Sequence, residues 1–301
     1  MELTAKKIVY YMDKAGLLRA LPDEPYLKLK FRVSIGKELD LENPLTFNEK
    51  MQWLKLYDRR PEYRIMADKY RVREYIAGKI GEKYLVPSLG VWDDPDDIDF
   101  DMLPDKFVLK CNHTSGLGVC ICGDRSRLDQ KAVIRELKKG MAHDYYVRGR
   151  EWPYKDMPRK IIGEQYLEDA PGKGNLTDYK IHCYGGQPRS VQVMSNRFGE
   201  GGMISDYYDS VTWEKLDMRR GTYRNDSHVH ERPDELPELL ELAEILSKDI
   251  PYLRTDFYIV DHKIYFGELT LFPASGFNPF NPEKYDYLFG SWITLPDHKT
   301  I

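Results

Sequence analysis

Three charged side chains near the end of the chain have the types and spacing of a chemical site. Arg254 and Asp256 lie two residues apart in one run of aromatic and β-branched residues, and Glu268 lies in a second such run. A short polar break separates the runs. This pattern predicts a β-hairpin with Arg254 and Asp256 on one face. Acids on apolar strands indicate that they meet a cation, although an ion pair on the surface of an edge hairpin would give the same pattern.

The loop 112–118 between two predicted strands is a candidate for binding phosphate. It contains the hydroxyls of Thr114 and Ser115 and the glycine Gly116, and Lys110 comes just before it. Glycine lets backbone N–H groups approach phosphate oxygens closely, and the lysine supplies the positive charge that such a loop lacks. It is not a Walker A loop, because the lysine precedes the glycines and a strand follows. An ordinary hairpin loop would have the same composition.

Four other charged residues indicate a site only when they are considered together. Lys69 lies in a predicted helix, and Glu164 follows an apolar strand and precedes a polar loop, as a hinge that reads adenine would. Asp178 and Lys180 alternate on the next strand and therefore share a face. Taken alone, each has an ordinary interpretation as a helix lysine, a strand-end acid or a charge pair.

Composition limits the classes of protein that can carry these residues. The 301 residues include 45 basic and 49 acidic side chains, so the formal charge of −4 gives no overall field for nucleic acid or anionic lipid. A hydrophobic content of 42% excludes disorder. Four cysteines fit a reducing compartment, and we find no signal peptide and no run of 18 apolar residues. We therefore expect a cytoplasmic protein with no membrane insertion and no nucleic-acid partner.

The elements that must position these side chains alternate between helical and strand patterns. A capping box begins the second of the expected helices, which lie at 3–20, 46–56, 61–77, 129–145, 236–246 and 287–293. Strands are expected at 84–91, 107–111, 119–122, 160–167, 178–184, 189–196, 253–260 and 264–273. This order predicts an α+β fold with mostly antiparallel sheet.

In chain order, over about residues 64 to 280, these features resemble the ATP-grasp superfamily. Segments 68–74, 109–116, 178–180 and 268–270 are most similar to its TupA-like branch, which is named for teichuronopeptide synthesis and is found among cell-surface polysaccharide genes. The resemblance implies an ATP-grasp fold in which two α+β subdomains clasp ATP behind an N-terminal helical extension. The expected divisions are 1–60 for the extension, 61–105 for a linking part of the core, 106–168 for the first subdomain and 169–301 for the second.

The resemblance also implies which residues contact ATP. Lys69 and Lys110 would clamp the α- and β-phosphates. The loop residues His113, Thr114, Ser115 and Gly116 would cover the β/γ end. Adenine would lie against Glu164, Gln165 and Leu167. Asp178 would face the ribose or, with Lys180, the phosphates.

For the reaction itself, the resemblance implies that Asp256 and Glu268 hold Mg²⁺. Arg254 would steady the transferring phosphoryl group or an acyl phosphate, and it is expected to be catalytic together with Lys180. Many ATP-grasp ligases have an asparagine two residues after the metal-binding glutamate, whereas this chain has Thr270. A hydroxyl can bind Mg²⁺ or orient a water, but it is a weaker ligand than a carboxamide oxygen.

The implied function is ATP-dependent carboxylate–amine ligation through an acyl phosphate. By family analogy, the acid is a uronic acid or amino acid of a surface glycan or its precursor, and the amine is an amino acid or amino sugar. Two alternatives remain, a kinase for a sugar or other hydroxyl and a non-catalytic nucleotide-binding protein of a glycan assembly system. The region 198–231 is expected to bind the acceptor through Arg197, Arg219, Arg220 and Arg224, unless it is a solvated basic loop.

Overall fold

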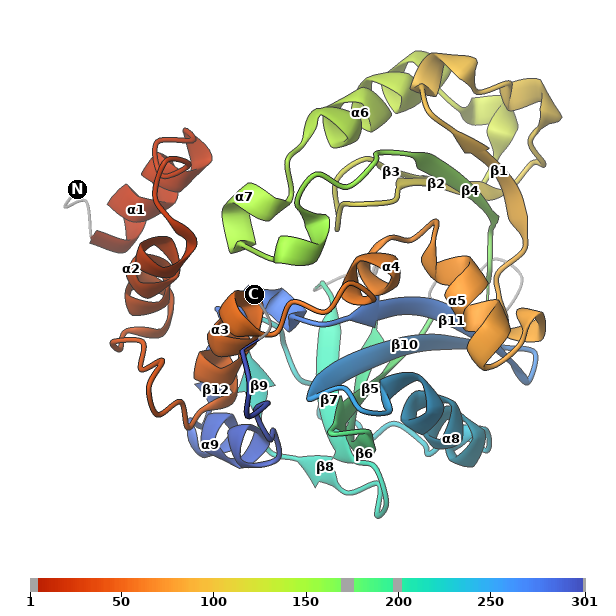
Figure 1. Cartoon of the computed structure of the whole chain (residues 1–301). Coiled ribbons are helices and arrows are strands. Elements are labelled where there is room, and N and C mark those ends of the chain that lie inside the picture. The colour runs from red at the N-terminus through yellow and green to blue at the C-terminus, as the bar shows by residue number, and fades with distance from the viewer. Residues whose placement is uncertain (1–4, 169–175, 197–201, 300–301) are drawn as a thin grey trace.

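The fold is built on two antiparallel β-sheets with a separate group of helices at the N-terminus. The computed structural model describes residues 5–168, 176–196 and 202–299. Figure 1 places the smaller sheet above the larger one, with α6 on the outer face of the smaller sheet and α8 beside the larger sheet. Within the described residues, no helix has the length and apolar character needed to cross a membrane.

The smaller sheet has four strands in the order β1-β4-β2-β3, all antiparallel. Its strands are β1 (Ser88–Trp92), β2 (Phe107–Cys111), β3 (Val119–Cys122) and β4 (Ile161–Gln165). The pleat of β2 alternates faces: Phe107, Leu109 and Cys111 are buried in a core under α6 (Gln130–Ala142), while Lys110 is on the opposite face. This alternation turns Lys110 away from the core.

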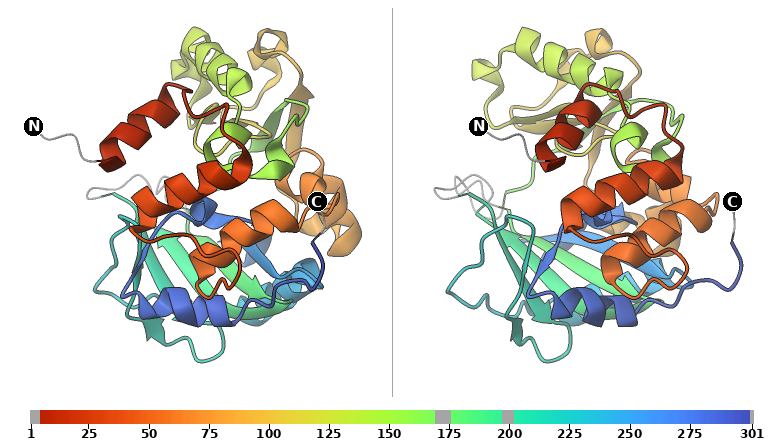
Figure 2. Two further views of the ribbon diagram at one scale, coloured as in Figure 1. Left: turned by 60° about the vertical axis from the view of Figure 1, so that its left-hand side comes forward. Right: turned by 90° about the vertical axis from the view of Figure 1, so that its left-hand side faces the viewer.

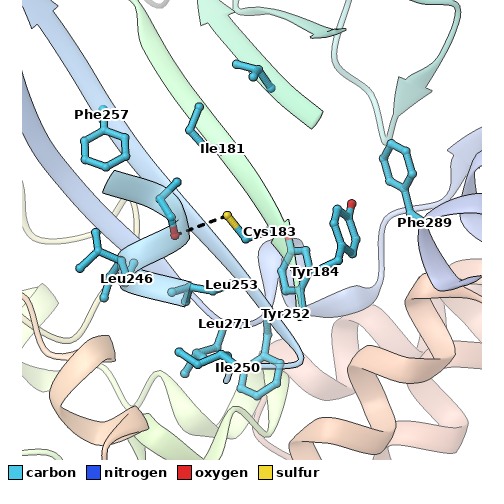
Figure 3. Packing of buried hydrophobic residues seen from close by; sticks show 14 of the residues in the cluster. Ile181, Cys183, Tyr184, Leu246, Ile250, Tyr252, Leu253, Phe257, Leu271 and Phe289 are labelled. Atoms are coloured by element: carbon cyan, nitrogen blue, oxygen red, sulfur yellow. Dashed lines mark hydrogen bonds between the residues drawn. The ribbon is translucent and has the colours of Figure 1, made fainter. Parts of the chain in front are cut away.

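The larger sheet has six strands in the order β11-β10-β5-β6-β7-β8. They are β5 (Asp178–Tyr184), β6 (Gln187–Ser195), β7 (Ile204–Asp209), β8 (Lys215–Leu216), β10 (Tyr252–Val260) and β11 (Lys263–Thr270). One face packs against α8 (Leu236–Ser247), where Ile181, Cys183, Leu253 and Phe257 meet Leu246 and its neighbours (Figure 3). The period of two therefore leaves the charged residues of β5 and β10 on the other face.

The N-terminal helices form a third packed group. Figure 2 shows α1 (Ala5–Lys14), α2 (Asp23–Ile35) and α3 (Phe47–Tyr57) together on one side of the molecule, with α9 (Lys284–Ser291) next to α3. The capping box predicted at the start of α3 is confirmed, since the Thr46 hydroxyl accepts from the Glu49 N–H and the Glu49 carboxylate accepts from the Thr46 N–H. A short pair of strands, β9 (Arg219–Arg220) and β12 (Phe280–Asn281), lies near this group.

The α+β class with antiparallel sheet is confirmed, and several element bounds are corrected. The first helix ends at Lys14 rather than near residue 20, and α2 was missed because its buried residues are few in a strongly charged segment. The helix expected over 61–77 is two helices, α4 (Tyr63–Ala67) and α5 (Val72–Lys79). The Asp68 carboxylate accepts from the N–H groups of Tyr70 and Arg71, and this local turn interrupts the helical pattern.

Two further segments differ from expectation. The helix expected over 129–145 ends at Ala142, and a short helix α7 (Tyr146–Gly149) follows it. Within 198–231, where no periodicity was visible, the described residues form β7, β8 and β9. β8 and β9 have two residues each and β9 pairs with the distant strand β12, which leaves little local signal. The domain boundaries at 60, 105 and 168 stay predictions.

Candidate active site

A cavity of about 620 Å³ lies between the two sheets, and its walls come from both of them. The cavity receives all the residues expected to form the site except His113 and Thr114. Those that line it are Lys69, Lys110, Ser115, Gly116, Glu164, Gln165, Leu167, Asp178, Lys180, Arg254, Asp256, Glu268 and Thr270. Residues as far apart in the sequence as Lys69 and Thr270 thus line one cavity.

The hairpin of β10 and β11 forms one wall of this cavity. Across the hairpin, Asp256 pairs with Glu268 and Arg254 pairs with Thr270. Arg254 binds Asp256 with two hydrogen bonds, Nε to Oδ1 at 2.6 Å and Nη2 to Oδ2 at 2.7 Å. The same Nη2 donates to the Thr270 hydroxyl at 2.9 Å and lies 3.7 Å from a Glu268 oxygen. The shared face of Arg254 and Asp256 is confirmed.

Asp256 is held by two cations at once. It is 2% exposed, and Lys180 from the neighbouring strand β5 donates to its Oδ2 alongside Arg254. Burial alone would raise the pKa of Asp256, but the charges of Arg254 and Lys180 hold it below the ordinary value. Lys180 also lies 3.8 Å from an oxygen of Asp178. Asp256 is therefore ionised at neutral pH and fully hydrogen-bonded to the cations of this wall.

Glu268 and Arg254 keep their charges for similar reasons. Burial would raise the pKa of Glu268, but the nearby Lys69, whose Nζ is 3.2 Å from the carboxylate, and Arg254 lower it. Burial would lower the pKa of Arg254, yet Asp256 and Glu268 raise it. Asp256 and Glu268 therefore lie among three cations, Lys69, Lys180 and Arg254.

Lys69 reaches the cavity because the turn at 68–71 interrupts the helical pattern. Its Nζ donates to the Thr114 carbonyl at 2.7 Å, and its N–H donates to the Asn112 carbonyl at 3.2 Å. The buried Asn112 amide links the same turn to the loop, since its Nδ2 donates to Asp68 Oδ1 at 2.9 Å. The lysine and the candidate phosphate loop are therefore fixed to each other.

Lys110 is paired with the acid expected at the adenine end. Its Nζ lies 2.6 Å from Glu164 Oε2, and Arg73 from α5 lies 3.4 Å from Glu164 Oε1. Lys110 is on β2 and Glu164 is on the adjacent strand β4, so the sheet brings these two side chains together. Without ligand, Lys110 and Arg73 are therefore both paired with Glu164, and a ligand that binds either cation must replace or share this carboxylate.

The loop 112–118 divides into two parts. His113 and Thr114 are buried and do not line the cavity: a ring nitrogen of His113 lies 3.1 Å from the His143 carbonyl, and the Thr114 hydroxyl donates to the Leu117 carbonyl. Ser115 and Gly116 do line it, and Gly116 has a left-handed φ of 74°. The expected contacts with the β/γ end therefore have support from geometry only at Ser115 and Gly116.

Sequence reasoning missed an acid and two tyrosines of the cavity, Glu151, Tyr145 and Tyr154. All three line the cavity, and the two tyrosine rings have centroids 4.6 Å apart. Burial raises the pKa of Glu151, and the charge of the neighbouring Lys55 lowers it. Burial has the larger effect, so the pKa of Glu151 is raised. The high tyrosine content was the only available signal, because these residues lie around short helical turns without periodicity.

The arginines expected to bind the acceptor are in different environments. Arg197 lies outside the described residues. Arg219 and Arg224 are exposed, whereas Arg220 is only 5% exposed and lines the cavity. The expectation of a solvated basic loop therefore fits Arg219 and Arg224 but not Arg220.

A buried polar network lies next to the hairpin wall. One nitrogen of His182 is 2.7 Å from the Tyr252 hydroxyl and the other is 3.2 Å from Gln192 Oε1, which only accepts hydrogen bonds. His182 pairs with Arg254 across β5 and β10. Burial, and then the positive charge of Arg254 and Arg220, lower the pKa of His182 well below its ordinary value. The imidazole is therefore neutral in the folded protein.

This network predicts a loss of stability in acid. The unfolded chain protonates His182 near pH 6.5 while the folded protein does not, so the free energy of unfolding falls as the pH drops below that value. We expect the contribution of His182 to approach about 1.4 kcal/mol per pH unit as the pH falls below 6.5 and the imidazole of the unfolded chain becomes fully protonated. Urea unfolding at several pH values measures this slope. His182→Gln should show a slope smaller by that amount, and equal slopes in the two proteins would contradict the assignment.

Two α+β layers with a cavity between them, lined by acids, lysines and two arginines, fit the class of ATP-grasp proteins. A family model described as TupA-like ATPgrasp matches residues 49–294, and the chain belongs to this family. A search of curated proteins finds no significant match.

Solved structures of ATP-grasp proteins are similar to this chain at low sequence identity. A D-alanine–D-alanine ligase from Bacillus anthracis complexed with ATP has 18% identity and a TM-score of 0.41, and the match covers 69% of this chain and 55% of that one. The corresponding ligase from Helicobacter pylori has 16% identity and a TM-score of 0.45, with 82% and 69% covered. A RimK domain ATP-grasp protein from Sphaerobacter thermophilus has 12% identity and a TM-score of 0.44, with 79% and 72% covered. The chain thus spans about half the length of the first of these proteins.

Proposed function

We propose that the protein is an ATP-dependent carboxylate–amine ligase that works through an acyl phosphate. The observation that carries this proposal is the wall on which Arg254, Asp256 and Glu268 lie together, with Lys69 and Lys180 in contact with the two acids. Phosphoryl transfer requires positioning and charge neutralisation more than covalent catalysis, and this set of side chains supplies both. Membership of the ATP-grasp family supports the same reaction class.

The two lysines are proposed to bind the phosphates of ATP. Without ligand, the Nζ of Lys69 lies beside Glu268 and that of Lys110 beside Glu164. Phosphate oxygens carry more charge than either carboxylate and would compete for the same ammonium groups. Ser115 and Gly116 would cover the terminal phosphates, and the far end of the cavity would take adenine. The residues proposed there are Glu164, Gln165, Leu167 and, toward the ribose, Asp178.

Asp256 and Glu268 are proposed to hold Mg²⁺. Among residues 5–168, 176–196 and 202–299, no three His, Cys, Asp or Glu side chains converge in a way that could hold a metal ion. Two acids suit Mg²⁺, because this ion commonly takes its other ligands from substrate phosphates and water. When bound, it would neutralise charge on the phosphates during transfer. Thr270, which is hydrogen-bonded to Arg254 and 3.5 Å from Glu268, would orient a neighbouring oxygen.

This donor set predicts that Mg²⁺ binds tightly only together with ATP. In the free protein, Asp256 accepts from both Arg254 and Lys180, and these cations oppose a second positive charge. Calorimetric titration with MgCl₂ alone should show at least about 100-fold weaker binding than titration in the presence of a non-hydrolysable ATP analogue. Equal affinity with and without the analogue would contradict the assignment. Glu241→Gln, on the exposed face of α8, is the control that should change neither value.

The proposed reaction has two steps. An oxygen of the substrate carboxylate attacks the γ-phosphorus of ATP, the bond to the β–γ bridging oxygen breaks, and ADP leaves with the bonding electrons. The amine nitrogen then attacks the acyl carbon and loses a proton, and phosphate departs with the electrons of the C–O bond. The guanidinium of Arg254 stabilises negative charge in both steps, and Asp256 fixes its orientation through two hydrogen bonds.

The substrates are proposed from family analogy. The acid would be a uronic acid or amino acid of a surface glycan or its precursor, and the amine would be an amino acid or amino sugar. The protein is predicted to be cytoplasmic, where ATP would be available. The test is an ADP-release screen of carboxylate and amine pairs with mass spectrometry of the product. An amide with free phosphate supports the ligase, whereas a stable phosphorylated hydroxyl would identify a kinase and overturn the proposal.

A further inference from the structure

Arg220 is a cavity residue that the proposed ATP and metal contacts do not use. It lies on β9, which pairs with β12, outside both large sheets. Its side chain is 5% exposed and lines the cavity, whereas that of Arg219, its neighbour on the same strand, is exposed. The two arginines therefore differ in environment although they are adjacent in sequence.

The partners of the Arg220 guanidinium are all uncharged. Nη2 donates to the Pro273 carbonyl at 3.1 Å and lies 3.5 Å from the Asn48 side-chain oxygen. Nε has no hydrogen-bond partner within the part of the chain that the structure describes. In that same part, no carboxylate lies within ion-pair distance of the guanidinium. The buried carboxylate of Asp286, which accepts from Asn48, is near enough for the charge of Arg220 to act on it, but it forms no direct ion pair with the guanidinium. A buried cation is stabilised most by an anion in direct contact, so an anionic ligand in the cavity would be favoured here.

Aromatic rings fix the orientation of this cation. Its central carbon lies 4.9 Å from the ring centre of Phe47 and 4.7 Å from that of Phe280. These contacts restrict the planar group, and a planar guanidinium presents paired donors along its edge that match carboxylate and phosphate oxygens. Pro273, which accepts one of these donors, is itself a cavity residue three positions after Thr270. The cation is thus preorganised beside the reacting wall.

We propose that Arg220 binds an anionic group, a carboxylate or a phosphate, on a substrate that enters the cavity together with ATP. The ligand's role as a substrate rests on the proposed function, but the anion site rests only on the burial and contacts of Arg220. Its expected selectivity is for charge: an anionic ligand should bind more tightly than a neutral ligand of the same size.

The test compares matched pairs of ligands by calorimetry, with the protein saturated by Mg²⁺ and a non-hydrolysable ATP analogue. The pairs are glutarate with glutaramide, and glucose 1-phosphate with glucose. The wild type should bind the anion of at least one pair about tenfold or more tightly than its neutral partner. The pair that shows this preference identifies carboxylate or phosphate as the preferred group. Equal binding within both pairs, including no binding of any probe, would overturn the proposal.

Variants assign the preference to one side chain. Arg220→Met keeps apolar length between the two rings and should lose the charge preference, whereas Arg219→Met on the same strand should keep it. Arg220→Lys retains the charge and should restore part of the preference, which a purely structural role would not predict. If Arg220→Met folds cooperatively and binds both anions as the wild type does, the assignment is wrong.

This inference and the proposed reaction can fail separately. If no acid and amine pair yields an amide but the charge preference depends on Arg220, the anion site stands and the ligase proposal fails. If an amide forms and Arg220→Met leaves the KM values of both substrates unchanged, the anion site fails and the ligase proposal stands.

Discussion

Replacing Glu268 by glutamine is expected to abolish most of the activity while leaving the protein folded. The substitution keeps the size of the side chain but removes one of the two carboxylates that face each other across the hairpin. Charge stabilisation of the transferring phosphoryl group then falls, and we expect kcat/KM to fall on the order of 10³-fold. The measurement is ADP release at saturating Mg²⁺, with the acid and amine that the product screen identifies.

Stability separates this effect from unfolding. The side chain of Glu268 is 29% exposed and its ion pairs lie at the cavity surface, so we expect the free energy of unfolding to change by no more than about 1 kcal/mol. The exposed Glu241→Gln variant on α8 should retain full activity. If Glu268→Gln is folded and retains acceptor-dependent ADP release at the wild-type rate, the catalytic interpretation fails.

Asp256→Ala is expected to have the largest effect on stability of any substitution on this wall. Asp256 is 2% exposed, and removing its carboxylate leaves Arg254 and Lys180 without their shared partner. Breaking a buried ion pair from one side costs about 3–5 kcal/mol, because the remaining charge stays desolvated. Urea unfolding of the variant measures the loss, and activity should also disappear.

A double variant tests the cause of this instability. Lys180→Met in the Asp256→Ala background removes one of the two buried cations that have lost the Asp256 carboxylate. This double variant should recover part of the lost stability. A loss of less than about 1 kcal/mol in the single variant, or no recovery in the double variant, would show that the buried charges are not coupled as the contacts indicate.

Local patterns in the sequence account for much of the fold. The hairpin of β10 and β11 follows from two runs of aromatic and β-branched residues around a polar break, and the start of α3 follows from the Thr46 and Glu49 capping box. The break at 68–71 was missed because the Asp68 carboxylate accepts hydrogen bonds from N–H groups that could otherwise belong to a helix. The sequence alone does not show that these bonds form in place of the helical ones. The strands β7 to β9 were missed because β8 and β9 have only two residues each, β9 pairs with the distant strand β12, and β7 carries acids and tyrosines without a regular alternation.

The candidate site was predictable where one strand or hairpin carries the chemistry. The pleat alone placed Arg254 and Asp256 on one face. The pairing of Lys110 with Glu164 was not predictable, since these residues meet only when β2 and β4 align. The burial of His113 depends likewise on its packing near His143. Arg220 was one of several arginines in an irregular region, and only the tertiary fold distinguishes it from its exposed neighbour.

The central claim is that the cavity forms an acyl phosphate from ATP and a carboxylate. Hydroxylamine tests this directly, because it replaces the amine substrate and converts an acyl phosphate into a hydroxamate that can be measured. Incubation with ATP, Mg²⁺ and the panel of carboxylic acids should give hydroxamate, ADP and phosphate in equal amounts, and Glu268→Gln should give none of them above background. ADP accompanied by a stable phosphorylated product without hydroxamate, or no ADP release with any acid, would contradict the account.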